Sequence, residues 1–329
     1  MTDKAKWIGH NGLQSLLPPS SKIKNSNGVD RYGFSTILAK RIGRSSAPRS
    51  FANWVHGWCW AENPTAKLLA CAKLPRELTM IVRNQIEKDA LESEGFSDVR
   101  VGGLPFSYIE QQHNFRHTNA LLAYPPHSAE AEVLSHDQAE YLDYLHSLRD
   151  DFECIYLSVY YLDIGGPLHK AATFRGLQVL QGARPDDSNS LLRVRSMLDS
   201  FKYVTSNVMG SHVLYALFSG CRFSFCGPIY EYSESTFLTN NNPHGHSSDY
   251  LSLALHLQSE SYLRERFKRF FVEHPKKGVM DTFFAKDTIG EGFMMNPEQI
   301  IDALGWSMRG QINGYFIGSL RRTSRLFFD

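Results

Sequence analysis

The sequence lacks any hydrophobic stretch that could cross a membrane, because no run approaches the ~18 consecutive apolar residues that a spanning helix needs. Its N-terminus, MTDKAKWIGHNG, also lacks the apolar core of a signal peptide. The cysteines are few and scattered, at Cys59, Cys71, Cys154, Cys221 and Cys226, without the spacing of a metal site or a disulfide framework. This usage suits a reducing compartment, so we expect a cytoplasmic protein.

Charge and signature motifs exclude further classes of function. With 35 Lys and Arg against 34 Asp and Glu, the formal net charge is +1, and we expect no nucleic-acid partner. The motifs GxSxG, GxGxxG and the P-loop are absent, which argues against a hydrolase, a dehydrogenase and an ATPase. HExxH and DxD are also absent, and the pairs His113/His117 and His244/His246 have no cysteine beside them, so we expect no metal site.

The sequence does have the length and composition of an ordinary globular protein with room for two domains. It has 329 residues, of which 42% are hydrophobic and 21% charged. Composition shifts divide it into a flexible N-terminal segment, a small α/β domain, a larger α/β domain and a helical tail, at residues 1–30, 31–118, 119–295 and 296–329.

Alternating helix and strand patterns in the first half predict a small parallel sheet with covering helices. Strands are expected at Ser50–His56, Glu77–Val82 and Val99–Val101, and helices at Tyr32–Ile42 and Asn84–Glu94. Ala66–Leu74 fits either a helix or a strand, and Gln111–Asn119 is polar enough to be a linker.

A second alternating series, over residues 119–228, is typical of a doubly wound, Rossmann-like domain. Its strands are expected at Ala120–Tyr124, Phe152–Tyr161, Leu177–Leu180, Phe201–Val204 and Arg222–Cys226, and its helices at Gln138–Leu148, Leu191–Leu198 and Val213–Phe218. Beyond a polar loop, Tyr250–Phe271 is predicted as one continuous helix and Pro297–Leu304 as another.

The stretch Phe201–Pro228 is the strongest candidate for a binding site. It combines a strand, a turn at Gly210-Ser211-His212 and a helix. A helix that begins at such a turn presents unpaired N–H groups and a partial positive charge, which suit a phosphate. The alternative is an ordinary packing turn in which small residues allow close approach.

Polar residues follow three of the predicted strands, at Pro126-His127-Ser128, at Asp163 before Gly165-Gly166, and at Ser206-Asn207 before Gly210-Ser211-His212. The carboxyl ends of parallel strands share one edge of a sheet, so these residues are expected to line one cleft. We expect His127 to donate to a base or phosphate, His212 to meet a phosphate as a cation, and Glu231 to bind ribose hydroxyls. A histidine taken alone is more often a structural residue, whereas three polar strand ends together favour a site.

A candidate general base lies in the first half, in Trp54-Val55-His56-Gly57-Trp58. His56 ends a predicted strand and is expected to face the opposite domain, where it could activate an acceptor hydroxyl. The alternative is that the tryptophans form an aromatic cluster that His56 caps. Asp163 is the competing catalytic candidate.

These motifs resemble those of GT-B glycosyltransferases of bacterial surface polysaccharide (capsule or O-antigen) synthesis. The resemblance is carried by VHGW, VGGLPFSYI, LLAYPPHS and VTSNVMGSHVLYALFSG, and covers most of residues 50–305. It implies an α/β fold with two Rossmann-like domains facing across a cleft, the first one small here. Sialyltransferases and Kdo transferases of this class hold CMP with a His-Pro motif and a paired Ser motif, to which Pro126-His127-Ser128 and Ser206-Asn207 are loosely similar, with His and Pro reversed.

The function that we predict is metal-independent transfer of a sugar from a nucleotide-sugar donor to a glycan or a lipid-linked glycan. The nucleotide-sugar is a co-substrate, and no separate cofactor is expected. Two alternatives remain open: a binding protein for nucleotide-sugar or glycan without catalysis, and another transferase on the same scaffold, such as one that moves phosphoglycerol.

The C-terminal stretch Tyr315–Phe328 is basic and apolar, with Arg321, Arg322 and Arg325 between leucines and phenylalanines. This pattern fits either a final helix packed on the first domain or an amphipathic segment in peripheral contact with the inner membrane.

Overall fold

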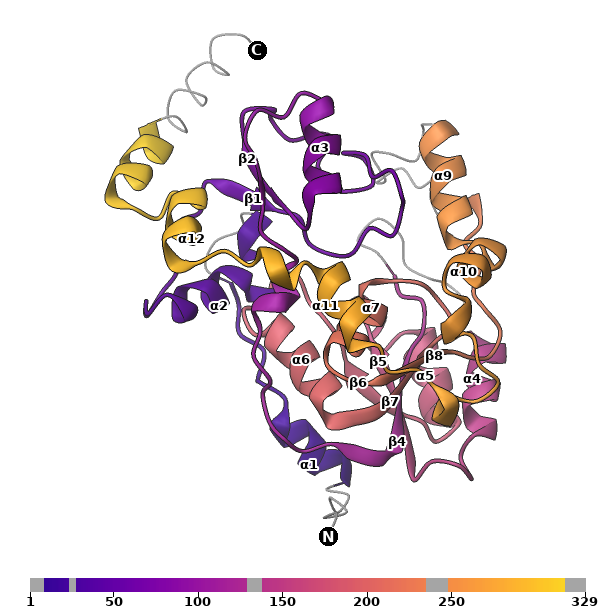
Figure 1. Ribbon diagram of the computed structural model, residues 1–329. Coiled ribbons are helices and arrows are strands. Elements are labelled where there is room, and N and C mark those ends of the chain that lie inside the picture. The colour runs from indigo at the N-terminus through magenta and orange to yellow at the C-terminus, as the bar shows by residue number, and fades with distance from the viewer. Residues whose placement is uncertain (1–8, 24–27, 129–137, 235–247, 317–329) are drawn as a thin grey trace.

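The larger of two sheets has five parallel strands in the order β6-β5-β4-β7-β8. The computed structural model describes residues 9–23, 28–128, 138–234 and 248–316 (Figure 1). In chain order the strands are β4 (His117–Tyr124), β5 (Cys154–Val159), β6 (Gln178–Gln181), β7 (Phe201–Ser206) and β8 (Arg222–Phe225). The first strand along the chain therefore lies in the middle, and the direction of winding reverses between β4 and β7. This is the strand order of a Rossmann sheet, in which ligands bind at the reversal point.

Helices cover both faces of this sheet because its strands are apolar on both sides. Leu121 and Ala123 of β4 pack into one hydrophobic cluster with α4 (Ala139–Ser147) and α5 (Pro167–Phe174). The alternate residues, Ala120 and Leu122, pack into a second cluster with α6 (Ser190–Ser200) and α7 (Ser211–Phe218). The predicted doubly wound arrangement is thus confirmed as an α/β fold with a parallel sheet.

The smaller sheet is also parallel, in the order β1-β2-β3. Its strands are β1 (Ala52–Trp54), β2 (Thr79–Val82) and β3 (Val99–Val101), flanked by α2 (Phe34–Arg41) and α3 (Gln85–Ser93). The Asn84 side chain accepts a hydrogen bond from Glu87 N–H and so begins α3 where the sequence predicts. Residues Ala66–Leu74 form turns rather than a helix or a strand.

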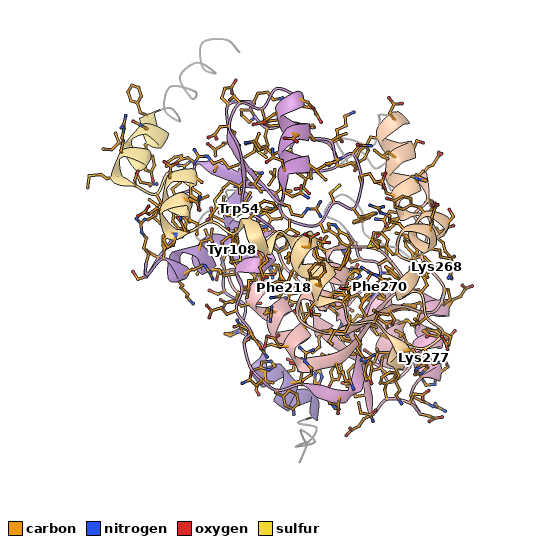
Figure 2. All side chains as sticks on the ribbon, in the orientation of Figure 1. Trp54, Tyr108, Phe218, Lys268, Phe270 and Lys277 are labelled. Atoms are coloured by element: carbon orange, nitrogen blue, oxygen red, sulfur yellow. The ribbon has the colours of Figure 1, made fainter. Side chains whose placement is uncertain are left out.

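The two sheets share one continuous hydrophobic cluster. It includes Trp54 and Ile81 of the smaller sheet and Leu122 and Val204 of the larger one. The 3₁₀ turn η2 (Pro105–Tyr108) lies between them, and its Phe106 ring stacks on Tyr215 of α7 at 4.1 Å between centroids. Figure 2 places Trp54 and Tyr108 together, next to the α2 side of the smaller sheet. The division into two domains facing across a cleft stays a prediction.

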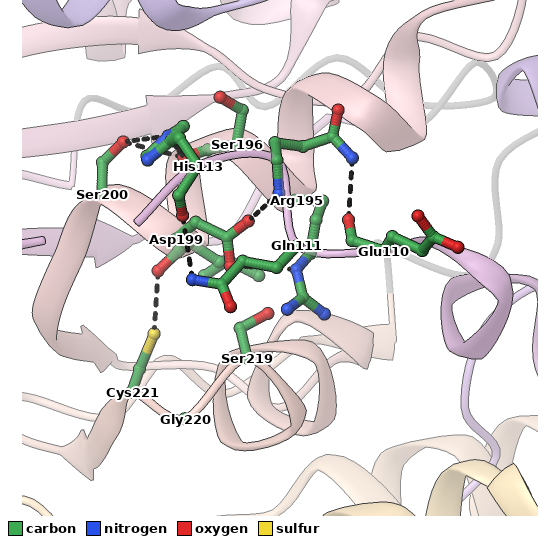
Figure 3. Close-up of polar contacts among 12 residues, drawn as sticks. Glu110, Gln111, His113, Arg195, Ser196, Asp199, Ser200, Ser219, Gly220 and Cys221 are labelled. Carbon is green, nitrogen blue, oxygen red and sulfur yellow. Dashed lines mark hydrogen bonds and ion pairs between the residues drawn. The ribbon is translucent and has the colours of Figure 1, made fainter. Parts of the chain in front are cut away.

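A buried polar cluster holds the linker that precedes β4 (Figure 3). The Asp199 carboxylate at the end of α6 accepts hydrogen bonds from Gln112 N–H at 2.8 Å and from Arg195 Nε at 2.9 Å. The ring of His113 lies 3.2 Å from Ser200 Oγ. Because the buried Asp199 and Ser200 side chains bind the linker at two places, the linker is fixed against α6.

The prediction of one continuous helix over Tyr250–Phe271 is wrong. Ser259 has extended backbone angles, φ −67° and ψ 143°, and its side chain accepts from Tyr262 N–H. A serine that caps a new helix in this way ends the one before it. The segment is therefore α9 (Ser248–Gln258), α10 (Glu260–Arg266) and the short turn η4 (Lys268–Phe270).

The C-terminal part of the described chain crosses back to the smaller sheet. After α11 (Thr282–Ile289), which contacts α7, come α12 (Pro297–Ala303) and a helix over residues 308–316. Leu304 C=O accepts from Phe51 N–H at 3.1 Å, and Trp306 Nε1 donates to Ser50 Oγ at 3.1 Å. The remaining elements are α1 (Gly9–Leu16), η1 (Gly28–Gly33), η3 (Tyr161–Asp163), η5 (Pro275–Lys277) and η6 (Glu291–Phe293).

Among the described helices, none combines the length and apolar character that crossing a membrane requires.

Candidate functional site

A cavity of ≈ 270 Å³ lies at the carboxyl edge of the larger sheet, at the reversal point between β4 and β7. Each of the central strands contributes the residues that follow it, and loops from the smaller sheet and η1 close the opposite side. The lining residues are Tyr32, His56, Gly57, Tyr124, Pro125, His127, Ser158, Tyr160, Gly182, Ala183, Leu191, Val194, Val208, Met209, Gly210, Ser211, His212, Tyr215 and Tyr232. The position is where a Rossmann sheet binds its ligand.

The predicted site residues divide into two groups. His56, His127, Gly210, Ser211 and His212 line the cavity. Ser128, Asp163, Ser206, Asn207 and Glu231 are not among its lining residues and make other contacts.

The turn before α7 brings the helix N-terminus to the cavity. Gly210 precedes the helix with extended backbone angles, φ −178° and ψ 177°, so no strain requires glycine there. Glycine is favoured there by lack of space, because a Cβ atom at this position would lie 2.9 Å from His212 Nδ1. Ser211 Oγ accepts from Trp58 N–H at 2.8 Å, which ties α7 to the loop that follows β1. The N-terminus of α7 thus borders the cavity, with Gly210, Ser211 and His212 among its lining residues.

His212 is held as a neutral imidazole. Its ring stacks on Tyr124 at 4.8 Å between centroids, and Nε2 lies 2.9 Å from Ser206 Oγ. Burial, and next the nearby His127, lower the pKa of His212 to about 3. The expectation that His212 meets a phosphate as a cation is therefore not supported by this environment.

Ser206 orients the ring of His212 through a small network of hydrogen bonds. Ser206 Oγ lies 2.7 Å from Tyr124 C=O and 2.8 Å from Val208 C=O, and a hydroxyl has a single hydrogen to donate to such acceptors. His212 Nε2, at 2.9 Å, is a third hydrogen-bond partner of the same oxygen, so Ser206 Oγ fixes the orientation of the His212 ring. Ser206 positions His212 and does not line the cavity itself.

His127 lies exposed at the rim. Its Nδ1 donates to Ser128 C=O at 2.7 Å, and its ring is 4.6 Å from that of Tyr160. Nε2 is thereby the nitrogen that remains to act as an acceptor in the neutral form or as a donor in the protonated form.

Asp163 and Ser128 fix the loop that follows β4. Both are buried, and Asp163 accepts two hydrogen bonds from Ser128, one from the backbone N–H at 2.9 Å and one from the hydroxyl. This pairing joins the end of β4 to the end of β5. The predicted catalytic role of Asp163 stays a prediction, and its observed contacts are those of a positioning residue.

His56 faces the cavity from the loop after β1. Its Nε2 donates to Gly28 C=O at 2.7 Å, so Nδ1 is the unprotonated nitrogen of the neutral ring. Burial lowers the pKa of His56 to about 4, against the raising effect of the Gly28 carbonyl. The ring is thus in the form that accepts a proton, although its basicity lies well below that of an ideal base at pH 7.

Asn207 and Glu231 contact the protein rather than the cavity. Asn207 Nδ2 donates to Pro228 C=O at 3.1 Å and is buried. Glu231 Oε1 accepts from Glu260 N–H at 2.9 Å and so caps the start of α10. The expected ribose contact of Glu231 competes with this cap.

Tyrosines are the residues that the sequence interpretation missed. Tyr32, Tyr124, Tyr160, Tyr215 and Tyr232 all line the cavity. Tyr124 ends β4 and Tyr160 follows β5, so their positions at strand ends were the available signal. Tyr32, which has φ 59° within η1, does not follow a predicted strand, so its position in the sequence gave no indication that it lines the cavity.

The lining of the cavity is aromatic and uncharged. No Arg, Lys, Asp or Glu occurs among the lining residues in the described part of the chain. Within the same ranges, no group of three or more His, Cys, Asp or Glu is arranged to hold a metal ion.

Comparisons with known proteins give little further information. No family model matches the chain, and no curated protein matches it. The crystal structure of TarM is similar over 82% of this chain and 52% of that one, with 12% identity and a TM-score of 0.34. The aligned part is thus about half of TarM, and a TM-score of this size establishes no common function.

Proposed function

We propose that the protein is a glycosyltransferase that binds a nucleotide-sugar donor in the cavity between β4 and β7. The observation that carries the proposal is the coincidence of three features at one place. They are the reversal point of a Rossmann-ordered sheet, an aromatic cavity and the N-terminus of α7. The acceptor in this proposal is a glycan or a lipid-linked glycan, and the assignment to bacterial surface polysaccharide synthesis comes from the motif resemblance alone.

The aromatic residues and the helix suit different parts of such a donor. Stacked rings such as Tyr124 with His212, and His127 beside Tyr160, offer flat apolar surfaces to a base or a sugar. The first turn of α7 offers N–H donors to phosphate oxygens. No separate cofactor is needed for this mode of binding.

The uncharged lining favours a CMP-linked donor over a nucleoside diphosphate sugar. The single phosphate of a CMP-sugar carries one negative charge, whereas the pyrophosphate group of a diphosphate donor carries two, and the comparison concerns these phosphate groups alone. The lining residues supply no cationic side chain to balance the second charge. One helix N-terminus, equivalent to about half an elementary charge, matches the smaller demand better.

Transfer would need a base for the acceptor hydroxyl if the reaction inverts configuration. We assign this role to His56 Nδ1, because His56 lines the cavity and is held as the neutral tautomer with that nitrogen unprotonated. The departing nucleotide phosphate would be stabilised by the N–H groups of α7.

A second candidate function is nucleotide-sugar binding without catalysis. It is favoured by the low pKa values of His56 and His212, about 4 and about 3, and by the engagement of Asp163 with Ser128. Under this alternative the cavity binds the donor but lacks an effective base.

Incubation with CMP-, UDP- and GDP-sugars, followed by mass spectrometry and calorimetry, tests both candidates. The enzyme is expected to bind CMP-sugars and to release free sugar slowly, through transfer to water. Binding without release of sugar would favour the second candidate. Absence of binding to every donor would contradict both.

A further inference from the structure

The helix over residues 308–316 presents an apolar face to solvent. Met308 is 83% exposed, Ile312 64% and Phe316 65%, and Tyr315 beside them is 55% exposed. Positions i, i+4 and i+8 follow one another along a single side of a helix. Four large apolar side chains therefore form one continuous surface, which we call the C-terminal apolar face.

The opposite side of this helix is docked on the protein through glycines. A Cβ atom at Gly314 would lie 2.5 Å from the Phe51 ring, and one at Gly310 would lie 2.7 Å from Gly305 C=O. Gln311 Nε2 donates to the carbonyls of Gly305 at 2.7 Å and Arg49 at 2.8 Å. This close contact fixes the rotation of the helix about its own axis. The C-terminal apolar face, on the other side of the helix, therefore points toward solvent. Figure 1 draws the helix in yellow beyond α12, at the outer edge of the molecule.

Positive charge borders the apolar face. The Arg49 guanidinium lies 5.6 Å from the centre of the Tyr315 ring, and Arg309 follows Met308 on the helix. Neither arginine forms an ion pair within the described ranges of the chain. The sequence from Ala303 to Phe328 contains no Asp or Glu, and it adds Arg321, Arg322 and Arg325.

We propose that the C-terminal apolar face binds the surface of a membrane that contains anionic lipid. Interfacial helices bind membranes in this way: their apolar side chains enter the boundary of the acyl chains, and their arginines lie at the level of the lipid head groups. A second copy of the chain is the less suitable occupant, because it would bring the same arginines against one another. This inference is independent of the proposed function and of the donor cavity.

Vesicle co-sedimentation of the full chain tests the proposal. Vesicles of phosphatidylcholine, with or without phosphatidylglycerol, are compared for wild type and for Ile312→Glu/Phe316→Glu. Wild type is expected to sediment with the anionic vesicles. The double variant should lose at least about tenfold in partition, because two apolar side chains no longer leave water. Arg49→Glu/Arg309→Glu should lose binding to anionic vesicles, and wild-type binding should weaken as salt rises.

Phe174→Glu/Phe283→Glu is the matched control, since these phenylalanines are 90% and 85% exposed on α5 and α11. It should bind vesicles as wild type does, and thermal melting should show that all variants are folded. Wild type remaining in the supernatant, or the Ile312/Phe316 variant sedimenting like wild type, would overturn the proposal. So would a wild-type dimer in light scattering that this variant abolishes without any vesicle binding, since the face would then belong to self-association.

Discussion

At the scale of single residues, the proposed chemistry of the cavity rests mainly on His56 and His212, two of the three histidines among its described lining residues. His56 and His212 each have Nε2 in a hydrogen bond, and burial is the main cause that lowers the pKa of each. A neutral imidazole has one donor and one acceptor, and because Gly28 C=O can only accept, the His56 ring offers Nδ1 as an acceptor to a bound ligand.

Replacement of His56 tests its assignment as the base. His56→Ala should lower turnover by about 10²–10⁴, the usual contribution of general-base catalysis, while nucleotide affinity stays nearly unchanged. The pH profile of kcat/KM should be flat from neutral pH downward and should fall only near the pKa of about 4. Turnover by His56→Ala close to that of wild type would remove the assignment.

The same two histidines predict how stability depends on pH. In the folded state the pKa is about 4 for His56 and about 3 for His212, below the ordinary value of 6.5. Between pH 6.5 and these lower values, the unfolded chain therefore binds more protons than the folded chain. Stability should therefore fall as pH decreases from about 6.5, by at most about 1.4 kcal/mol per pH unit for each histidine.

Urea unfolding at pH 5 and pH 7 measures this dependence. In His212→Phe, which keeps a ring against Tyr124, the difference between the two pH values should be smaller than in wild type. An equal or larger difference in the variant would show that His212 is not the group that titrates.

At the scale of elements, the linker before β4 is held by one buried carboxylate. Asp199 pairs with Arg195 and accepts from the Gln112 backbone. Asp199→Ala should therefore cost about 3–5 kcal/mol, because it leaves the Arg195 charge buried and unpaired. Asp143→Ala, which breaks the solvent-exposed pair with Arg175, should cost much less than Asp199→Ala. Denaturant unfolding of both variants gives the comparison, and similar losses would contradict the structural role of Asp199.

Most elements were predictable from the sequence because their signals are local. The alternation of Leu121, Leu122 and Ala123 between two apolar faces, and the Asn84 cap of α3, appear directly in the pattern of residues. The break at Ser259 was missed because the apolar period continues through it, and only the backbone angles show that serine begins a new helix.

The candidate site was predictable only in part, for a related reason. The sequence predicted that the carboxyl ends of the parallel strands lie together and line one cleft. His127, Gly210 and His212, which follow these strands, do line one cavity. The pairing of Asp163 with Ser128, and the approach of Tyr32 to the cavity, depend on contacts between distant segments. Such contacts leave no periodic trace in the sequence.

At the scale of the whole molecule, the two sheets meet at the cavity. Trp58 N–H donates a hydrogen bond to Ser211 Oγ. Gly57 has a positive φ of 90°, and a Cβ atom added to it would lie 3.2 Å from the same oxygen. A ligand between β4 and β7 would therefore contact both parts of the chain. Gly57→Ala should be strained there and should weaken nucleotide affinity together with stability, which calorimetry and thermal melting would show. Unchanged values of both would contradict this close approach.

The central claim is that the turn before α7 holds the phosphate of a nucleotide. Titration calorimetry of CMP into wild type, Gly210→Val and Gly292→Val tests it most directly. A side chain at Gly210 would meet the His212 ring and cover the helix N-terminus, whereas Gly292 has open space around it. Wild type and Gly292→Val are expected to bind CMP with one site, and folded Gly210→Val should bind it at least about tenfold more weakly. Equal affinity in all three folded proteins, or no binding by wild type to CMP or to any other nucleotide, would contradict the account.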